Sequence, residues 1–244
     1  MMNVHHALII AAGRGSRFGA ATEWRPKPLI EIDGIPLICR VFSCASQAGI
    51  DGFTVVTGYK GEILEEYLCR NVPPGISVRF LRNEFWWGLN GISVLRAKGH
   101  LPGLFVLLMA DHLFDSRILK NLLVHPLPRG HCRLAVDFHL GRVSDLADAT
   151  KVSVRGGWIA DIGKGIENYN AVDTGIFFCS HGIFDALEKA ISAGRAGLSD
   201  GILELAHVRK MEALDIGDLF WRDIDDGEGL LDAEKWLKGK RDQG

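Results

Sequence analysis

The most informative part of the chain lies near its N-terminus, where residues 8–19 read LIIAAGRGSRFG. The run begins as an apolar strand, ends in the small residues Ala11 and Ala12, and opens into a loop that contains Gly13 and Gly15. Because glycine has no Cβ atom, such a loop lets backbone N–H groups approach the oxygens of a phosphate. The stretch therefore predicts a buried strand followed by a phosphate-binding loop.

Two common phosphate-binding loops are excluded by their spacing. The dinucleotide fingerprint GxGxxG, started at Gly13, requires glycine at position 18, where this chain has Phe18. A Walker loop requires Gly-Lys followed by Ser or Thr, and residues 13–19 contain no lysine. The sequence therefore disfavours a Rossmann oxidoreductase and a Walker-type site.

Two cationic side chains accompany this loop. Arg17 lies inside it, and Lys27 follows within the segment RPKPL at residues 25–29. The prolines on either side restrict the backbone around Lys27 and so hold it in place. Two cations beside a glycine loop can neutralise a triphosphate and the pyrophosphate that leaves it. We therefore expect Arg17 and Lys27 to act on a nucleoside triphosphate.

Carboxylates occur at two places that we expect to meet the loop. The apolar run 104–110 ends at Asp111, and ligands of open α/β sheets bind beyond the carboxyl ends of the strands. Residues 221–226 read WRDIDD, and in a strand Asp223 and Asp225 would project from one face. Carboxylate oxygens are the ligands that Mg²⁺ prefers. Asp111, Asp223 and Asp225 are therefore the predicted ligands of a magnesium ion.

Short apolar runs alternate with helix-like stretches, which predicts a mainly parallel sheet covered by helices. The expected strands of the first half are 7–12, 53–57, 78–81 and 104–110, with helices at 36–47, 61–69 and 92–98. In the second half, strands are expected at 132–139, 150–154, 158–162, 171–179 and 211–214, with helices at 181–193, 199–207 and 229–238. No obvious linker separates the halves. We therefore expect one domain over residues 1–244, with a nucleotide-binding half of about 1–130 and an acceptor- and metal-binding half of about 131–244.

The composition is that of an ordinary globular protein: of 244 residues, 47% are hydrophobic and 24% are charged. With 28 basic and 30 acidic side chains the net charge is −2, which does not favour nucleic acid as a partner. The five cysteines form no CxxC pair, which argues against a disulfide framework and a zinc ribbon. The sequence shows no signal peptide and no apolar run of about 20 residues, so we expect no membrane span and a cytoplasmic location.

Two segments, AAGRGSRFG at 11–19 and RPKPLIEIDGIPLI at 25–38, together resemble the opening of the nucleotidyltransferases that make nucleoside-diphosphate sugars, cholines and polyols. That superfamily carries AAGxGxR, a spacer and then PKP. The resemblance implies an α/β fold, a three-layer α/β/α sandwich of the glycosyltransferase-A-like type built on a mainly parallel mixed sheet. It implies catalytic roles for Arg17, Lys27 and Asp111. The residues that it implies for nucleotide binding are Ala11, Ala12, Gly13, Arg14, Gly15, Ser16, Asn90 and Gly91.

Three later segments resemble the cytidylyltransferases that activate inositol 1-phosphate with CTP, giving a phospholipid precursor. They are ATKV at 149–152, DIGK at 161–164 and VDTG at 172–175. The resemblance implies CTP and a small phosphorylated acceptor as partners, with Mg²⁺ as the cofactor. A phosphate oxygen of the acceptor would attack the α-phosphorus of CTP without a general base. The side chains implied at the acceptor are Lys151, Lys164, Asp173 and Thr174.

Other acceptors stay open at this point. A cage of Tyr59, Trp86, Trp87 and Trp158 would favour phosphocholine through cation–π contacts, and a phosphonate or a sugar 1-phosphate also fits the motifs. The sequence does not distinguish cytosine from uracil, or a homodimer from a monomer. A catalytically silent nucleotide-binding subunit is disfavoured, because it would not need the cations and carboxylates named above.

Overall fold

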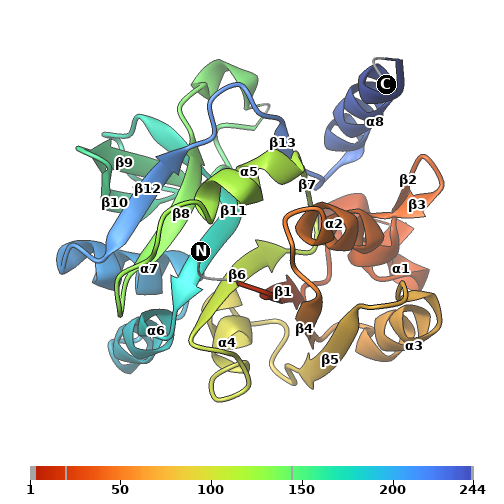
Figure 1. Cartoon of the computed structure of the whole chain (residues 1–244), viewed down its shortest axis with the longest axis horizontal. Coiled ribbons are helices and arrows are strands. Elements are labelled where there is room, and N and C mark those ends of the chain that lie inside the picture. The colour runs from red at the N-terminus through yellow and green to blue at the C-terminus, as the bar shows by residue number, and fades with distance from the viewer. Residues whose placement is uncertain (1–3, 20, 144, 243–244) are drawn as a thin grey trace.

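The computed structural model describes residues 4–19, 21–143 and 145–242. At its centre lies a nine-stranded mixed sheet (Figure 1). From one edge to the other, the strands are β5 (Ser77–Arg82), β4 (Gly52–Thr57), β1 (His6–Ala11), β6 (Leu104–Met109), β11 (Ala171–Ser180), β8 (Cys132–Asp137), β12 (Met211–Asp215), β10 (Trp158–Gly163) and β9 (Lys151–Arg155). Because β6 pairs with β11, strands from both halves of the chain form one continuous sheet.

The directions of the strands determine which loops meet. β4 and β6 run parallel to β1, so the loops that follow β1 and β6 leave the sheet at the same edge. β11 runs antiparallel to β6, with Ser180 opposite Leu104 and Ile176 opposite Leu108. The first residues of β11 therefore lie at the edge where β6 ends.

Helices cover both faces of the sheet, and the alternation of side chains along β1 explains the three layers. Ala7, Ile9 and Ala11 belong to one buried core, whereas Leu8 and Ile10 belong to the other. The first core is completed by α2 (Leu37–Ser46), α3 (Gly61–Asn71) and α5 (Ser116–Leu122). The second core is completed by α4 (Asn90–Leu95), α6 (Gly182–Ser192) and α7 (Leu198–His207). The expected α/β/α sandwich is confirmed.

Two small sheets lie outside the main one. β2 (Glu31–Ile32) and β3 (Ile35–Pro36) form a hairpin, and β7 (His112–Phe114) pairs with β13 (Trp221–Asp223). The C-terminal α8 (Gly227–Asp242) packs beside them at the upper right of Figure 1, through an apolar cluster that includes Ile32, Leu113 and Ile224. Shorter turns complete the chain: η1 (Ser16–Phe18), α1 (Ala21–Trp24), η2 (Lys27–Leu29) and η3 (Leu140–Arg142).

The strands and helices expected from the sequence are present, with ends shifted by a few residues. The structure adds α1, α5, the β2–β3 hairpin and β7, which pairs with β13. It also corrects one expectation, because Asp223 and Asp225 do not project from one strand. β13 ends at Asp223, and the chain then turns at Ile224, whose side chain is buried and whose N–H donates to the Asp111 carbonyl at 3.0 Å. None of the described helices is long and apolar enough to cross a membrane.

Candidate active site

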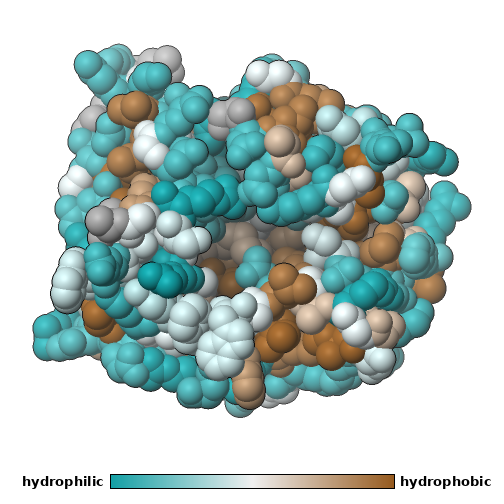
Figure 2. Space-filling model, turned by 180° about the vertical axis from the view of Figure 1, so that it is seen from behind, coloured by the Kyte–Doolittle hydropathy of each residue, from teal (hydrophilic) through white to brown (hydrophobic). Residues whose placement is uncertain are grey.

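A cavity of about 1010 Å³ lies over the edge of the sheet where β1 and β6 end. Its lining includes Gly13 and Arg17 from the glycine loop, Asp111 and His112 after β6, and Asp173 near the start of β11. Later segments around residues 142–150, 162–164 and 218–226 complete the wall. Figure 2 shows a hollow on the face turned away from the viewer in Figure 1, surrounded mostly by hydrophilic side chains.

Gly15 allows the glycine loop and Lys27 to come together. Its φ angle is +66°, a left-handed conformation that residues other than glycine rarely adopt. A Cβ atom on Gly15 would lie 2.7 Å from Cβ of Lys27 and 2.8 Å from its Cδ. The stem of Lys27 therefore packs directly on the loop, and the residue is only 4% exposed.

The ammonium group of Lys27 lies among three carboxylates. Its Nζ donates to Oδ2 of Asp111 at 2.6 Å and to Oδ1 of Asp225, and Oδ1 of Asp223 is 3.8 Å away. Burial disfavours the charged form of Lys27, but the three carboxylates outweigh that effect and raise its pKa. Burial likewise opposes the charge on Asp111, but Lys27 and then His112 lower the pKa of Asp111 to about 2. Lys27 and Asp111 therefore form an ion pair at neutral pH.

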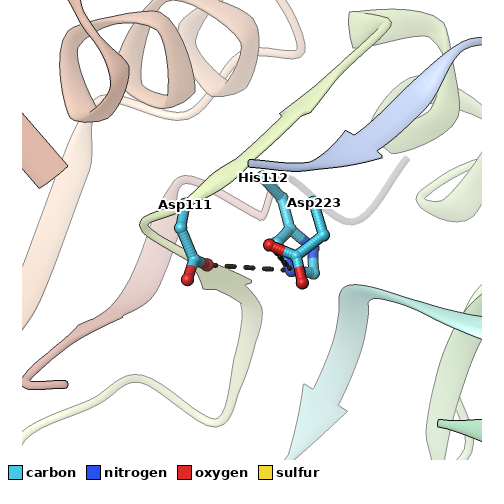
Figure 3. Close-up of side chains that lie close together, drawn as sticks. All are labelled: Asp111, His112 and Asp223. Atoms are coloured by element: carbon cyan, nitrogen blue, oxygen red, sulfur yellow. Dashed lines mark ion pairs between the residues drawn. The ribbon is translucent and has the colours of Figure 1, made fainter. Parts of the chain in front are cut away.

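Asp111, His112 and Asp223 bring one ligand atom each within 4.8 Å of the other two (Figure 3). Nε2 of His112 is 3.7 Å from an oxygen of each carboxylate. Nδ1 of His112 donates to the Thr174 carbonyl at 2.7 Å, which fixes the ring and directs Nε2 to the carboxylates. Burial opposes the charge of His112, but Asp223 and Asp111 raise its pKa.

The state of Asp223 fits a divalent cation at this group. Its Oδ1 is buried and has no hydrogen-bond partner in the part of the chain that the structure describes. Burial raises the pKa of Asp223 to about 7, although His112 opposes the rise. Carboxylate and imidazole donors are common ligands of divalent metals. Asp225, the third ligand expected from the sequence, instead directs its oxygens to Lys27 and, at 2.7 Å, to Arg17.

Arg17 connects the glycine loop to the opposite wall. Its Nη2 is 2.6 Å from Oδ2 of Asp148, and Oδ1 of Asp148 is 2.5 Å from Nζ of Lys164. Burial opposes the charge of Arg17, but Asp225 and Asp148 raise its pKa. Lys164 lines the cavity, whereas Nζ of Lys151 donates to the Lys164 carbonyl at 2.7 Å. Lys151 therefore holds the main chain of the lysine that faces the cavity.

Asp173 and Thr174 point to opposite sides of β11, as neighbouring residues of a strand do. Asp173 lines the cavity and accepts the N–H of Gly175 at 2.7 Å. Burial raises the pKa of Asp173 to about 6, although the hydrogen bond from Gly175 opposes the rise. The hydroxyl of Thr174 is fully buried and donates to the Ala135 carbonyl at 2.7 Å. The expectation that Thr174 faces the acceptor is corrected: its carbonyl holds His112 instead.

The loop residues expected to bind the nucleotide differ in exposure. Gly13 lines the cavity, and Arg14 and Ser16 are exposed. The side chains of Ala11 and Ala12 are buried at the end of β1, where they pack in the two cores on opposite faces of the sheet. The two alanines therefore support the loop and do not reach the cavity with their side chains.

Asn90 and Gly91 open α4 and have different surroundings. Asn90 lines the cavity. Gly91 is buried, and a Cβ atom there would lie 2.5 Å from the Ala196 carbonyl and 2.9 Å from a methyl group of Leu187. The structure therefore gives Gly91 a packing role, because it lets α4 approach the segment before α7.

The aromatic residues do not form the four-membered cage that would favour phosphocholine. Trp86 contacts Tyr59 and Trp87, with ring centres 5.1 and 5.8 Å apart. Trp158 packs instead against His131, at 5.9 Å between ring centres. The group is divided between separate parts of the molecule.

The structure adds site residues that sequence reasoning missed, namely Asp137 and Asp148. Oδ2 of Asp137 accepts the indole N–H of Trp221 at 2.9 Å and so ties β13, which carries Asp223, to the end of β8. Asp137 had the same signal as Asp111, an apolar strand that ends in an acid. The pairing of Asp148 with Arg17 had no sequence signal, because it joins two loops that are distant along the chain.

Comparisons with known proteins relate this geometry to named relatives. Residues 7–205 match the MobA-like NTP transferase domain. Over 96% of its length the chain is 30% identical to the bifunctional IPC transferase and DIPP synthase of Aquifex aeolicus, and 31% identical to that of Rubrobacter xylanophilus. The match covers 52% of each relative, so the chain spans about half the length of these curated proteins.

Solved structures share the fold. The inositol-1-phosphate CTP transferase from T. maritima superimposes with a TM-score of 0.81 at 24% identity, over 96% of this chain and 97% of that one. A UDP-glucose pyrophosphorylase complexed with UDP-glucose gives 0.82 at 20% identity, over 97% and 99%. These likenesses establish the nucleotidyltransferase, glycosyltransferase-A-like fold. Since the family match covers most of the chain, the protein belongs to the MobA-like NTP transferase family and is a nucleotidyltransferase.

Proposed function

We propose that the protein transfers the cytidylyl group of CTP to a phosphorylated polyol, inositol 1-phosphate, and releases pyrophosphate. The observation that carries this proposal is the buried ammonium group of Lys27, held between the glycine loop and the Asp111 and Asp223 carboxylates. The inositol phosphate acceptor is supported by the names of the relatives, which include an inositol-1-phosphate CTP transferase.

In this proposal the glycine loop and its cations bind the nucleotide. Arg17 and Lys27 neutralise the phosphates of CTP, and the loop from Gly13 to Ser16 approaches them through its backbone. Asn90, at the cavity wall, contacts the base. The charge that develops on the departing pyrophosphate is then met by groups that already occupy fixed positions.

We propose Mg²⁺ as the cofactor. Asp111 and Asp223 would hold it, with His112 beside them. Asp225, which pairs with Lys27, would become a third ligand when that ion pair breaks. When bound, the ion would supply a Lewis acid that neutralises charge on the reacting phosphoryl oxygens. Lys27 keeps Asp111 ionised, because its charge outweighs the burial that opposes the charge of this carboxylate.

The chemical step is an in-line displacement at the α-phosphorus of CTP. An oxygen of the acceptor phosphate forms the new P–O bond, and the bond to the oxygen that bridges the α- and β-phosphorus atoms breaks. Pyrophosphate leaves with that electron pair. No proton has to be removed from the nucleophile, so the residues act by orientation and charge neutralisation.

On the acceptor side, we propose that Lys164 binds the phosphate and Asp173 the polyol hydroxyls, with Lys151 holding the Lys164 main chain.

We also propose that residues 1–244 act as one domain, which the shared nine-stranded sheet supports. The five cysteines are free thiols, which supports a reducing, cytoplasmic location.

A pyrophosphate-release assay with Mg²⁺ tests the proposal, with each of four nucleoside triphosphates crossed against a panel of phosphorylated acceptors. The panel contains inositol 1-phosphate, phosphocholine, a phosphonate and glucose 1-phosphate. We expect the rate of pyrophosphate release to be higher with CTP and inositol 1-phosphate than with every other pair of substrates. A higher rate with another pair would contradict the proposed identity of the acceptor or of the base. No pyrophosphate release with any pair would contradict nucleotidyl transfer to these acceptors.

A further inference from the structure

The carboxylate of Asp148 contacts two cations that belong to different sides of the cavity. Its Oδ2 lies 2.6 Å from Nη2 of Arg17, in the glycine loop. Its Oδ1 lies 2.5 Å from Nζ of Lys164, directly after β10. One side chain therefore joins the cation proposed for the nucleotide phosphates to the cation proposed for the acceptor phosphate.

Asp148 occupies the place of an anionic ligand. It lines the cavity, and carboxylate and phosphate oxygens use the same guanidinium and ammonium donors. A substrate phosphate that binds Arg17 or Lys164 must therefore replace an existing ion pair with Asp148. The bridge pairs both cations with one carboxylate, and Arg17 has a second ion pair with Asp225.

The two carboxylates that contact Arg17 differ in their surroundings. Asp225 also contacts Lys27, beside the proposed magnesium ligands. Asp148 pairs with Arg17 and Lys164, so its charge faces the two cations that the substrates require. An anion left at that position repels an incoming phosphate.

The bridge can open without disturbing the sheet. Asp148 lies in a turn before β9, in which its N–H donates to Oδ1 of Asp145 at 3.1 Å. Lys151 holds the main chain on both sides of the ion pair, because its Nζ donates to the Ala147 carbonyl at 3.3 Å and to the Lys164 carbonyl at 2.7 Å. The side chains of Asp148 and Lys164, 39% and 57% exposed, are therefore the parts of the bridge that can move.

We propose that Asp148 is a positioning residue that couples the nucleotide site to the acceptor-phosphate site, an inference that rests on the proposed function. The first substrate to bind displaces the carboxylate from both cations, since an anion left between them repels the bound phosphate. The second substrate then meets a cation that has no ion pair with Asp148 to break. Binding of the two substrates is therefore mutually favourable, and by linkage each raises the affinity of the other by the same factor.

The test is calorimetric titration in Mg²⁺ with cytidine 5′-(α,β-methylene)triphosphate, which binds but cannot transfer its cytidylyl group, and with inositol 1-phosphate. Each ligand is titrated alone and in the presence of the other. The variants are Asp148→Asn, which removes the charge, and Asp148→Glu, which keeps it. Glu167→Gln is the matched control, because it removes one exposed negative charge on the loop that follows Lys164.

In the wild-type protein, each ligand is expected to raise the affinity of the other about three- to tenfold. In Asp148→Asn, each ligand alone binds about three- to tenfold more tightly, since no ion pair has to be broken, and the mutual effect falls close to one. Asp148→Glu retains the coupling, and Glu167→Gln changes neither quantity. Thermal melting of each variant shows that it is folded.

Unchanged affinity and unchanged coupling in folded Asp148→Asn would overturn the inference. A wild-type protein that binds both ligands independently would also overturn it. Failure of the wild-type protein to bind the nucleotide analogue is a separate result, which would contradict the proposed function itself.

Discussion

Lys27 and Lys164, the lysines proposed for the nucleotide and for the acceptor, are held in place by different means. Lys27 is 4% exposed, and its stem packs against Gly15 on a loop anchored to the central sheet. Lys164 has a side chain that is 57% exposed and is held by an ion pair with Asp148. Packing therefore fixes Lys27, the buried cation proposed for the nucleotide, whereas a contact that a substrate can replace holds Lys164, the cation proposed for the acceptor.

The largest effect is expected from Lys27→Ala. The substitution removes a buried cation that faces the proposed reacting phosphates and leaves Asp111 beside Asp223 and Asp225 without it, so the rate should fall by about 10²–10³-fold. Steady-state pyrophosphate release measures the change. Lys120→Ala, an exposed lysine on α5, is the control and should retain full activity. Retention of more than about a tenth of the rate in folded Lys27→Ala would contradict its assigned role.

Gly15→Ala tests whether packing places that lysine. The new Cβ would meet the Lys27 stem at 2.7 Å, so the ammonium group should shift and the rate should fall about 10- to 100-fold. Gly19→Ala is the control for backbone strain, because its φ of +54° and ψ of −124° disfavour a side chain at least as strongly, but no atom lies within 4 Å of the added Cβ. Gly15→Ala should lose about 1 kcal/mol of stability through backbone strain, and Gly19→Ala should lose at least as much. Equal rates in the two variants would show that the contact with Lys27 is unimportant.

Lys164→Ala should have a smaller effect, confined to the acceptor. Because the side chain is more than half exposed, we expect KM for the acceptor to rise about three- to tenfold, with little change in KM for CTP. Initial rates with each substrate varied in turn separate the two constants. A matching rise in KM for CTP would remove the distinction between the two sides of the cavity.

Asp173→Asn should produce the smallest change, an increase in stability at neutral pH. Burial raises the pKa of Asp173 from 3.8 to about 6, so the folded state favours the protonated form. The stability that this preference contributes is fully present below about pH 4 and is lost as the pH rises through 6. The variant avoids the loss, and its amide oxygen can still accept the Gly175 N–H. Its free energy of unfolding at pH 8 should therefore exceed that of the wild type by about 1–2 kcal/mol.

Denaturant unfolding at pH 4 and at pH 8 measures this effect. The difference between wild type and Asp173→Asn should nearly vanish at pH 4. Asp161→Asn, on β10, supplies the comparison for the loss of one acidic group. A constant difference at both pH values would contradict the burial argument for Asp173.

Local pattern was enough to predict that the glycine loop, Lys27 and Asp111 meet at one edge of the sheet. The strand, the glycine turn and the prolines around Lys27 lie within 22 residues of one another, at residues 8–29, and the apolar run before Asp111 marks the edge of the sheet. Such short-range signals predict the structure well because local conformational preference and burial favour the same conformation there.

Other parts of the cavity depend on contacts that no local pattern specifies. His112 joins the carboxylates because β7 pairs with β13, a contact between distant segments. Thr174 could have been placed correctly, since alternation along a strand prevents it from facing the same side as Asp173. The bridge from Asp148 to Arg17 depends on two loops whose separation only the folded chain sets.

The most direct test of the central claim is ³¹P NMR of the protein with CTP, inositol 1-phosphate and Mg²⁺, compared with its Asp111→Asn variant. With the proposed function, the wild-type protein forms a diphosphate diester and an equal amount of pyrophosphate, and the variant forms them about 10²–10³-fold more slowly. Absence of any diphosphate diester from the wild-type reaction, or its undiminished formation by Asp111→Asn, would contradict it.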